Sequence, residues 1–290
     1  MDLRFAFIIN PNSGKRKKYN VVDLITENFP KNIEKDFIIW KDKNDFVSVK
    51  KKIFEKKYTH IIAVGGDGTV NKVASCLIKS EMILGILPLG SGNGLARSLG
   101  VPMNIKDAIL FLLKASNKKI DVGFINEEPF FCTAGVGFDA RIGKLFLNSK
   151  KRGLLNYIKL ISKELWLYRS KSYKISIENK VFHQKAFLIT FANAGQYGND
   201  FFIAPEANMN DGLLHVVFVK PFGFFGFFEL MPKILRKKAH QSKYIETILL
   251  KNLKISLPIA DVFHFDGEPS QDVIELDLSI NASALKVLSN

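Results

Sequence analysis

Three glycines surround an aspartate in the segment Gly65-Gly66-Asp67-Gly68. The preceding run, His60–Val64, is apolar and typical of a buried strand. The residues that follow repeat at the spacing of one helix face: Val70, Val73, Ala74, Leu77 and Ile78. Glycines between a strand and a helix let the backbone approach an anion, and the helix N-terminus supplies N–H groups for it. Since an ordinary tight turn needs one glycine or two, the segment predicts a phosphate-binding loop.

Two further loops of this kind follow neighbouring strand candidates. The glycine-rich loop Pro88–Gly94 comes after Ile83–Leu87, and Asn10–Gly14 comes after Arg4–Ile9. Because open α/β sheets bind ligands at the carboxyl ends of their strands, we expect the loops to face one crevice. No segment matches G-x-x-x-x-G-K-[ST], which excludes a Walker-type P-loop.

Three other motifs permit two interpretations each. Asp-Gly, a strong hairpin-turn dipeptide, occurs in Phe265-Asp-Gly-Glu268 and at Asp211-Gly212. Carboxylates there could instead accept a proton or help to hold a hard cation, and the residues alone leave both options open. The segment Gly135–Ala140 fits G-x-G-x-x-[G/A], but it lacks an acidic residue about 20 positions on within a βαβ unit. It is therefore a weak dinucleotide signal.

The elements that would position these motifs alternate in the first part of the chain. A second strand is predicted at Phe37–Trp40, and helices are predicted over Val21–Phe29, over Phe46–Phe54 and from about Asn104. Strands that alternate with helices indicate a doubly wound parallel sheet covered on both faces.

The pattern changes near residue 124. Two helical stretches, Gly153–Tyr168 and Phe224–His240, interrupt a series of strand candidates. Those candidates are Phe130–Thr133, Tyr173–Glu178, Val181–Asn193, Leu213–Val219, Leu253–Leu257, Val262–Phe265 and Val273–Leu278. This series favours antiparallel β structure. We expect domains at 1–124 and 125–290, with the final strand Ala284–Leu288 a candidate to return to the first.

Composition excludes several classes of protein. The 290 residues are 47% hydrophobic and carry a net charge of +14, in the range of globular chains. Two cysteines, Cys76 and Cys132, are too few for a disulfide framework, so we expect reduced thiols in a cytoplasmic protein. No signal peptide is expected, and the apolar stretch Leu213–Met231 is interrupted by His215, Lys220 and Pro221, so no transmembrane helix is expected either.

In an ordered set of segments, the chain resembles the diacylglycerol kinase catalytic-domain family, which includes bacterial lipid kinases, sphingosine kinases and ceramide kinase. The segments are Asn10–Gly14, Gly65–Asn71, Leu89–Arg97, Ile120–Gly123, Ala204-Pro205 with Asp211–Leu213, and Phe265–Pro269. The first part of the second segment is also shared with NAD kinases and phosphofructokinases, whereas the whole set is specific to the lipid kinases. The resemblance covers nearly the whole chain. It implies an α/β N-terminal nucleotide-binding domain, a C-terminal β-sandwich domain that takes the lipid, and ATP in the cleft between them.

The resemblance also implies site residues. The nucleotide contacts would be Asn10, Pro11, Asn12, Ser13, Gly14, Gly65, Gly66, Asp67, Gly68, Thr69, Val70, Asn71, Gly90, Ser91 and Asn93. The catalytic acidic pair would be Asp266 and Glu268, one of which acts as general base toward the lipid hydroxyl. Asp67 and Asp121 would be linked to the catalytic Mg²⁺, directly or through water. A structural metal site would lie around Asn208, Asp211 and Leu213.

Two residues depart from the family's pattern. Lys72 stands where the family usually has Glu, and Trp40 occupies a position where many members place Thr near the nucleotide. Lys72 reverses a charge beside the predicted loop, which is compatible with altered nucleotide handling, a compensating partner or lost activity. The Ser-Gly-Asn form of the second loop is closer to sphingosine and ceramide kinases, although one residue does not assign a substrate.

Two segments combine basic and apolar residues in a way that suits an anionic membrane surface. Lys150, Lys151, Arg152, Lys159, Lys163, Arg169 and Lys171 surround a helix with Leu154, Tyr157, Ile158, Ile161 and Leu165 on its other face. In the second segment Phe222, Phe224, Phe225, Phe227 and Phe228 precede Lys233, Arg236, Lys237 and Lys238. The alternative is a solvated basic face on a packed helix. No nucleic-acid-binding motif is present, no obligate protein partner is evident, and a homodimer stays open.

The sequence therefore predicts a peripheral, ATP- and Mg²⁺-dependent kinase that phosphorylates diacylglycerol or a related lipid. A kinase of a soluble substrate such as NAD, and a non-catalytic nucleotide- or lipid-binding protein, are the alternatives.

Overall fold

The computed structural model describes residues 3–11, 20–40, 45–149, 154–198 and 201–290. The chain divides into two compact units. The first consists of Met1–Ile120 with Ser283–Asn290, and the second is Asp121–Ala282. The first unit thus ends at Ile120, and the C-terminal segment belongs to it.

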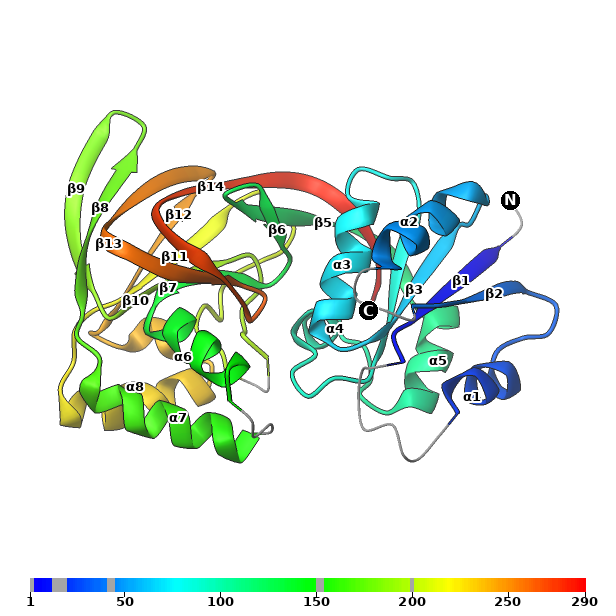
Figure 1. The fold of residues 1–290 in the computed structure, drawn as a ribbon, viewed down its shortest axis with the longest axis horizontal. Coiled ribbons are helices and arrows are strands. Elements are labelled where there is room, and N and C mark those ends of the chain that lie inside the picture. Colours follow the sequence, from blue (N-terminus) through cyan, green and yellow to red (C-terminus); the bar gives the residue numbers. More distant parts are fainter. Residues whose placement is uncertain (1–2, 12–19, 41–44, 150–153, 199–200) are drawn as a thin grey trace. The chain divides into compact units, whose positions relative to one another are not determined.

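The first unit is built on parallel strands in the order β4-β3-β1-β2, with the end of β14 beside β4. The strands are β1 (Arg4–Ile9), β2 (Glu34–Ile39), β3 (His60–Gly65) and β4 (Ile83–Pro88). Its helices are α1 (Val21–Asn28), α2 (Phe46–Glu55), α3 (Asp67–Leu77), α4 (Gly94–Ser98) and α5 (Ile105–Lys114). Every residue of β3 is buried, as expected for a parallel strand covered on both faces. Figure 1 shows α2 and α3 on one face of the sheet and α1 and α5 on the other, which confirms the predicted doubly wound arrangement.

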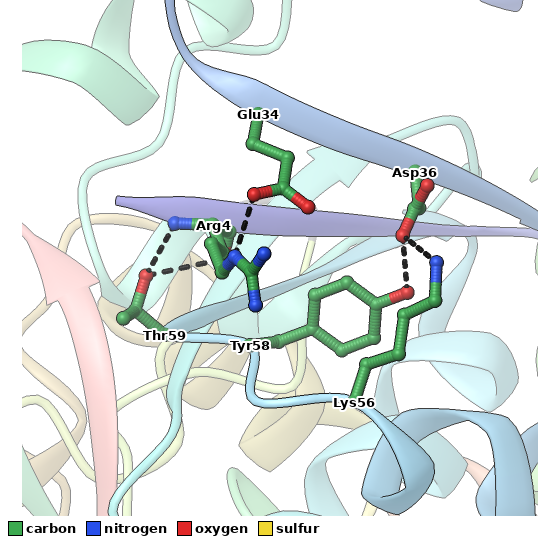
Figure 2. Close-up of polar contacts among 6 residues, drawn as sticks. All are labelled: Arg4, Glu34, Asp36, Lys56, Tyr58 and Thr59. Atoms are coloured by element: carbon green, nitrogen blue, oxygen red, sulfur yellow. Dashed lines mark hydrogen bonds and ion pairs between the residues drawn. The ribbon is translucent and has the colours of Figure 1, made fainter. Parts of the chain in front are cut away.

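Polar contacts tie the amino ends of these strands together (Figure 2). Arg4 donates from Nε to Glu34 Oε2 over 2.5 Å, which links β1 to β2. Asp36 Oδ2 accepts hydrogen bonds from Tyr58 Oη at 2.6 Å and Lys56 Nζ at 2.8 Å. The hydrogen bonds from Lys56 and Tyr58 hold the pKa of Asp36 below its ordinary value. The opposite, carboxyl ends of the strands carry the predicted ligand loops.

The second unit is mainly antiparallel. Its strands are β5 (Ser116–Ile125), which begins in the first unit, β6 (Glu128–Phe130), β7 (Thr133–Gly137), β8 (Lys171–Ile177), β9 (Lys180–Ala186), β10 (Leu188–Ala192), β11 (Leu214–Val219), β12 (Ile245–Leu250), β13 (Asn252–Phe265) and β14 (Glu268–Ser289), which ends in the first unit. They run in the order β12-β11-β10-β7-β13-β14, while β8 pairs with β13 and β9. Tyr173, Phe191, Val216 and Ile255 are fully buried in the core between strands. This arrangement agrees with the predicted β-sandwich domain.

Three helices lie against a second core of this unit, α6 (Phe138–Leu147), α7 (Leu154–Leu167) and α8 (Phe224–Leu235), and a 3₁₀ turn spans Ala239–Gln241. Phe138 of α6, Phe187 and Leu230 of α8 are buried in this core. Phe187 also divides the segment predicted as one strand, Val181–Asn193, into β9 and β10. Its ring lies 4.6 Å from that of Phe138 and 4.7 Å from that of Phe222, so it packs among the helices rather than between strands.

Candidate functional site

In the first unit, the glycine-rich loop Gly65–Gly68 is in van der Waals contact with the loop Pro88–Gly94. A Cβ atom at Gly90 would lie 2.7 Å from Gly66 Cα, and one at Gly66 would lie 3.2 Å from Gly90 Cα. The amide of Leu89 donates to the carbonyl of Gly65 over 2.8 Å. These two positions therefore require glycine because the backbones meet there, at the carboxyl ends of β3 and β4.

Asp67 holds the second loop against the first. It is the first residue of α3, and its carboxylate accepts hydrogen bonds from the amides of Asn93 at 2.9 Å and Gly94 at 2.7 Å. A Cβ atom at Gly92 would lie 2.9 Å from the same carboxylate, so that position also has no room for a side chain. The carboxylate that the family resemblance links to Mg²⁺ thus has a structural task as well.

Asn93 gives the second loop its shape. Its φ of 53° is left-handed, a conformation that asparagine tolerates better than most residues. Its side-chain oxygen accepts from the amide of Gly90 at 3.0 Å, and its side-chain nitrogen donates to the carbonyl of Gly90 at 2.9 Å. Ser91, the hydroxyl residue of this loop, is exposed to solvent.

The loop after β1 reaches the same edge of the sheet. Asn10 donates from Nδ2 to Thr69 Oγ1 over 2.9 Å, which connects this loop to α3. Pro11 follows in a turn, whereas Asn12, Ser13 and Gly14 lie outside the described residues. Three loops from sequence-distant segments therefore meet at the carboxyl ends of β1, β3 and β4.

The remaining predicted nucleotide residues are in the first turns of α3. Gly68 is half-buried, Val70 packs into the core, and the backbone carbonyl of Asn71 accepts from Ser75 Oγ at 2.7 Å. The helix begins at Asp67 with Gly66 as its N-cap, and the cap makes no side-chain hydrogen bond to it. An anion at this end can therefore accept from first-turn N–H groups.

The two departures from the family pattern contact each other. The Lys72 ammonium group lies 5.6 Å from the centroid of the Trp40 ring, within the range of a cation–π interaction. Trp40 follows β2, is buried, and packs on the ring of Phe46 with centroids 4.9 Å apart. The indole thus holds a lysine at the position where the family usually has a glutamate.

In the second unit, Asp266 occupies a two-residue hairpin turn between β13 and β14. Asp266 and Gly267 have positive φ values of 47° and 82°, as in a type I′ turn. The Asp266 carboxylate turns back to the segment that enters β7 and accepts from the amides of Phe131 at 2.9 Å, Cys132 at 2.8 Å and Thr133 at 3.2 Å. Asp266 therefore forms a hairpin turn and also presents a fixed carboxylate. The interpretation as a turn does not exclude the interpretation as a functional carboxylate.

Glu268 is placed differently, although it is close in sequence. It begins β14, pairs with Phe265, and its side chain is exposed. Among the described residues its carboxylate has no hydrogen bond or ion pair. Of the predicted acidic pair, the structure therefore immobilises Asp266 alone.

Asp121 and the predicted structural metal loop meet in the second unit. Asp121 is buried, and its Oδ2 accepts from the amide of Gly212 at 2.7 Å. In the loop, the side chains of Asn208 and Asp211 accept from the amides of Asn210 at 3.2 Å and Leu213 at 2.9 Å. No group of three or more His, Cys, Asp or Glu side chains suited to a metal was found in the described part of the chain. A cation here would depend on backbone carbonyl oxygens.

The structure also contains a buried polar network that the sequence did not reveal. It includes His264 of β13, two residues before Asp266. Asp139 Oδ2 accepts from Tyr197 Oη and contacts His264 Nε2, both at 3.0 Å, and Tyr197 is hydrogen-bonded to Thr190. A Cβ atom at Gly135 would lie 2.5 Å from Asp139 Oδ2 and 2.7 Å from His264 Nε2. The first glycine of the weak G-x-G-x-x-A motif therefore makes room for an aspartate–histidine pair. The only sequence signal was the glycine spacing, which local patterning could not connect to His264.

Comparisons with known proteins agree with this architecture. A family model described as "Diacylglycerol kinase catalytic domain" matches residues 4–125. A second model, "YegS C-terminal NAD kinase beta sandwich-like domain", matches residues 132–289. The order of these two matches along the chain confirms the resemblance drawn from the motifs.

Curated relatives and solved structures extend the comparison. "Probable lipid kinase YegS-like" of Klebsiella pneumoniae is 31% identical over 80% of this chain and 78% of its own length. The protein of the same name from Chromohalobacter salexigens is 27% identical over 78% and 74%. A crystal structure of a diacylglycerol kinase from Bacillus anthracis aligns with a TM-score of 0.73 at 20% identity, covering 99% of this chain and 97% of that one. The last comparison shows the fold alone.

Proposed function

Since this chain belongs to the diacylglycerol kinase catalytic-domain family and is a kinase, we propose that it transfers the γ-phosphoryl group of ATP to the hydroxyl group of a lipid. Diacylglycerol is the acceptor that the description of the matching family model names. The observation that carries the proposal is the contact of two glycine loops, locked by the Asp67 carboxylate, at the N-terminus of α3.

The first unit supplies the proposed nucleotide site. Backbone N–H groups at the start of α3 and in the second loop are suited to phosphate oxygens, and the glycines allow them to come close. Asn10 and Thr69 form a polar edge beside this position. Such preorganised donors stabilise charge that develops on the transferred group without reorganising during the reaction.

A magnesium ion fits this donor set. Each oxygen of the half-buried Asp67 carboxylate accepts one amide hydrogen bond, and a carboxylate oxygen has two lone pairs. Asp67 could therefore hold a metal-bound water while it keeps the second loop in place. When bound, the ion would neutralise charge on the phosphate oxygens.

The second unit supplies the proposed general base. Three backbone amides hold the Asp266 carboxylate in one orientation, and a fixed position is one requirement of a general base. In the proposed step, the lipid hydroxyl oxygen forms a bond to the γ-phosphorus and its proton passes to Asp266. The bond from the γ-phosphorus to the bridging oxygen breaks, and ADP leaves. Glu268 is the alternative base.

The test supplies purified protein with radiolabelled ATP, Mg²⁺ and vesicles that contain diacylglycerol, phosphatidylglycerol, a sphingoid base or ceramide, each separately. We expect label in the organic phase for at least one lipid class, and label confined to that class identifies the acceptor. Labelling of NAD in the aqueous phase instead would indicate a soluble acceptor. Nucleotide binding without transfer to any of these acceptors would overturn the proposal.

A further inference from the structure

Helix α8 is apolar on both sides, although only one side is covered. Gly226, Leu230 and Ile234 repeat every four residues and face the helix-covered core of the second unit. On the other side, Phe225 is 85% exposed and Phe228 is 58% exposed, and Leu235 continues the same stripe two turns later. Large apolar side chains gathered on the open side of a helix whose other side is already packed indicate a surface that takes a partner.

Helix α7 extends this open side. Trp166 stacks on Phe224 with ring centroids 5.3 Å apart and planes 30° from parallel, so the ends of the two helices form one continuous surface. Trp166 and Phe224 each expose more than half of their area, and Leu167 beside them is 64% exposed. Figure 1 shows α7 and α8 on the same side of the strands of this unit. We call this set the aromatic surface: Trp166, Leu167, Phe224, Phe225, Phe228 and Leu235.

Exposed basic side chains that form no ion pair among the described residues border the aromatic surface. Each helix has one acidic residue, and both are already paired: Glu164 with Arg141 at 2.7 Å, and Glu229 with Lys233. Exposed basic residues lie on α7, just after it, and just after α8: Lys159, Lys163, Arg169, Arg236, Lys237 and Lys238. Apolar rings bordered by basic side chains match the interface of an anionic bilayer, where the rings enter the acyl boundary and the cations meet the headgroups.

We propose that the aromatic surface docks the enzyme on anionic lipid bilayers. This inference rests on the proposed function, because a lipid acceptor resides in such a bilayer. None of the described helices is long and apolar enough to cross a membrane, so docking would be interfacial. A second copy of this chain would bring the same basic residues against one another, which opposes self-association through this surface.

The test measures co-sedimentation of the full chain with vesicles of phosphatidylcholine alone or mixed with phosphatidylglycerol. We expect binding to the mixed vesicles that weakens as salt is raised. The double variant Phe225→Glu/Phe228→Glu should bind them at least about tenfold more weakly, because two inserted rings are lost. Phe54→Glu is the matched control, since Phe54 is a half-exposed phenylalanine of α2 in the other unit, and it should bind like the unsubstituted protein.

A second measurement reports on the surface directly. The chain has two tryptophans, and Trp40 is buried while Trp166 is exposed. Mixed vesicles should therefore shift the emission of Trp166 to shorter wavelength, and Trp166→Phe should abolish the shift. An unshifted emission, or binding by the double variant equal to that of the unsubstituted protein, would overturn the inference. So would a dimer that the double variant dissociates while vesicle binding is unchanged.

The experiment separates this inference from the proposed function. A short-chain diacylglycerol dispersed in water needs no bilayer, so the double variant should phosphorylate it as fast as the unsubstituted protein does. If neither protein turns over any lipid but the vesicle results are as expected, the proposed function fails and the aromatic surface stands. If turnover of the dispersed lipid is normal and the double substitution does not change vesicle binding, the inference about the aromatic surface fails and the proposed function stands.

Discussion

Replacing Asp266 with Asn separates the two tasks of this carboxylate. Its oxygens accept three amide hydrogen bonds, at 2.8, 2.9 and 3.2 Å. The Asn oxygen can keep the amides of Cys132 and Thr133, whereas its NH₂ group would face the amide of Phe131. One donor is left without an acceptor, at a cost of about 1–3 kcal/mol. Asparagine tolerates the φ of 47° well, so little backbone strain is added.

The assay combines a thermal melt with steady-state kinetics. For a unit of this size, the lost hydrogen bond should lower the melting temperature by about 2–12 °C. If Asp266 is the general base, kcat should fall by about 10²–10⁴-fold in protein that is still folded at the assay temperature. Glu268→Gln is the control for the melt, because its exposed side chain makes no hydrogen bond or ion pair among the described residues, and the melting temperature should not change.

Three results would contradict this reasoning. Asp266→Asn with kcat within about twofold of the unsubstituted protein would remove Asp266 from the chemistry and leave it a structural role. A large loss of kcat in Glu268→Gln alone would move the base to Glu268. An unchanged melting temperature for Asp266→Asn would show that the three amide hydrogen bonds contribute less than assumed.

The first unit offers two further predictions. Gly90→Ala would push a Cβ atom against Gly66 Cα, and this overpacking, which costs about 1–3 kcal/mol, should separate the two loops. The Kd for ATP, measured by calorimetry, should rise at least about tenfold. An unchanged Kd would contradict this prediction. Asp36→Asn should lower stability slightly at neutral pH. The hydrogen bonds from Lys56 and Tyr58 depress the folded-state pKa of Asp36, so they stabilise the fold at pH values above the ordinary pKa of 3.8. That contribution is lost as pH falls through the lowered pKa, so melts of the variant and the unsubstituted protein should converge below about pH 3.8, and a constant difference would exclude this origin.

Local patterning predicted the first unit well, because its strands are short, apolar and separated by amphipathic helices. Arg4–Ile9 was predicted with the bounds that β1 has, and α2 differs from its prediction by one residue at its end. In the second unit β5, α6 and β12 were not predicted, and the strand predicted at Phe130–Thr133 is wrong, because that segment contains only the end of β6 and the start of β7. Helix α6 begins directly after β7 and contains Gly143, so its start and its apolar periodicity are weak in sequence.

The sequence named Ala284–Leu288 as a candidate to return to the first domain, but it did not give the strand that this segment joins. β14 begins in the second unit, and its last residues return to the first, where Val287 pairs with Leu84 of β4. Such a return depends on pairing between residues about 200 positions apart, which no window along the sequence contains.

By itself, the sequence determined which chemistry is present. The glycine spacing predicted phosphate-binding loops, because glycine has no side chain and lets the backbone come close to an anion. The order of the motifs pointed to the lipid kinase family. Only the tertiary structure decided what each carboxylate contacts: Asp67 clamps a loop 26 residues away, and Asp266 binds amides more than 130 residues away. It also paired Lys72 with Trp40 and left the apolar side of α8 uncovered. These outcomes depend on which distant segments fold against one another, so the residue types alone could not establish them.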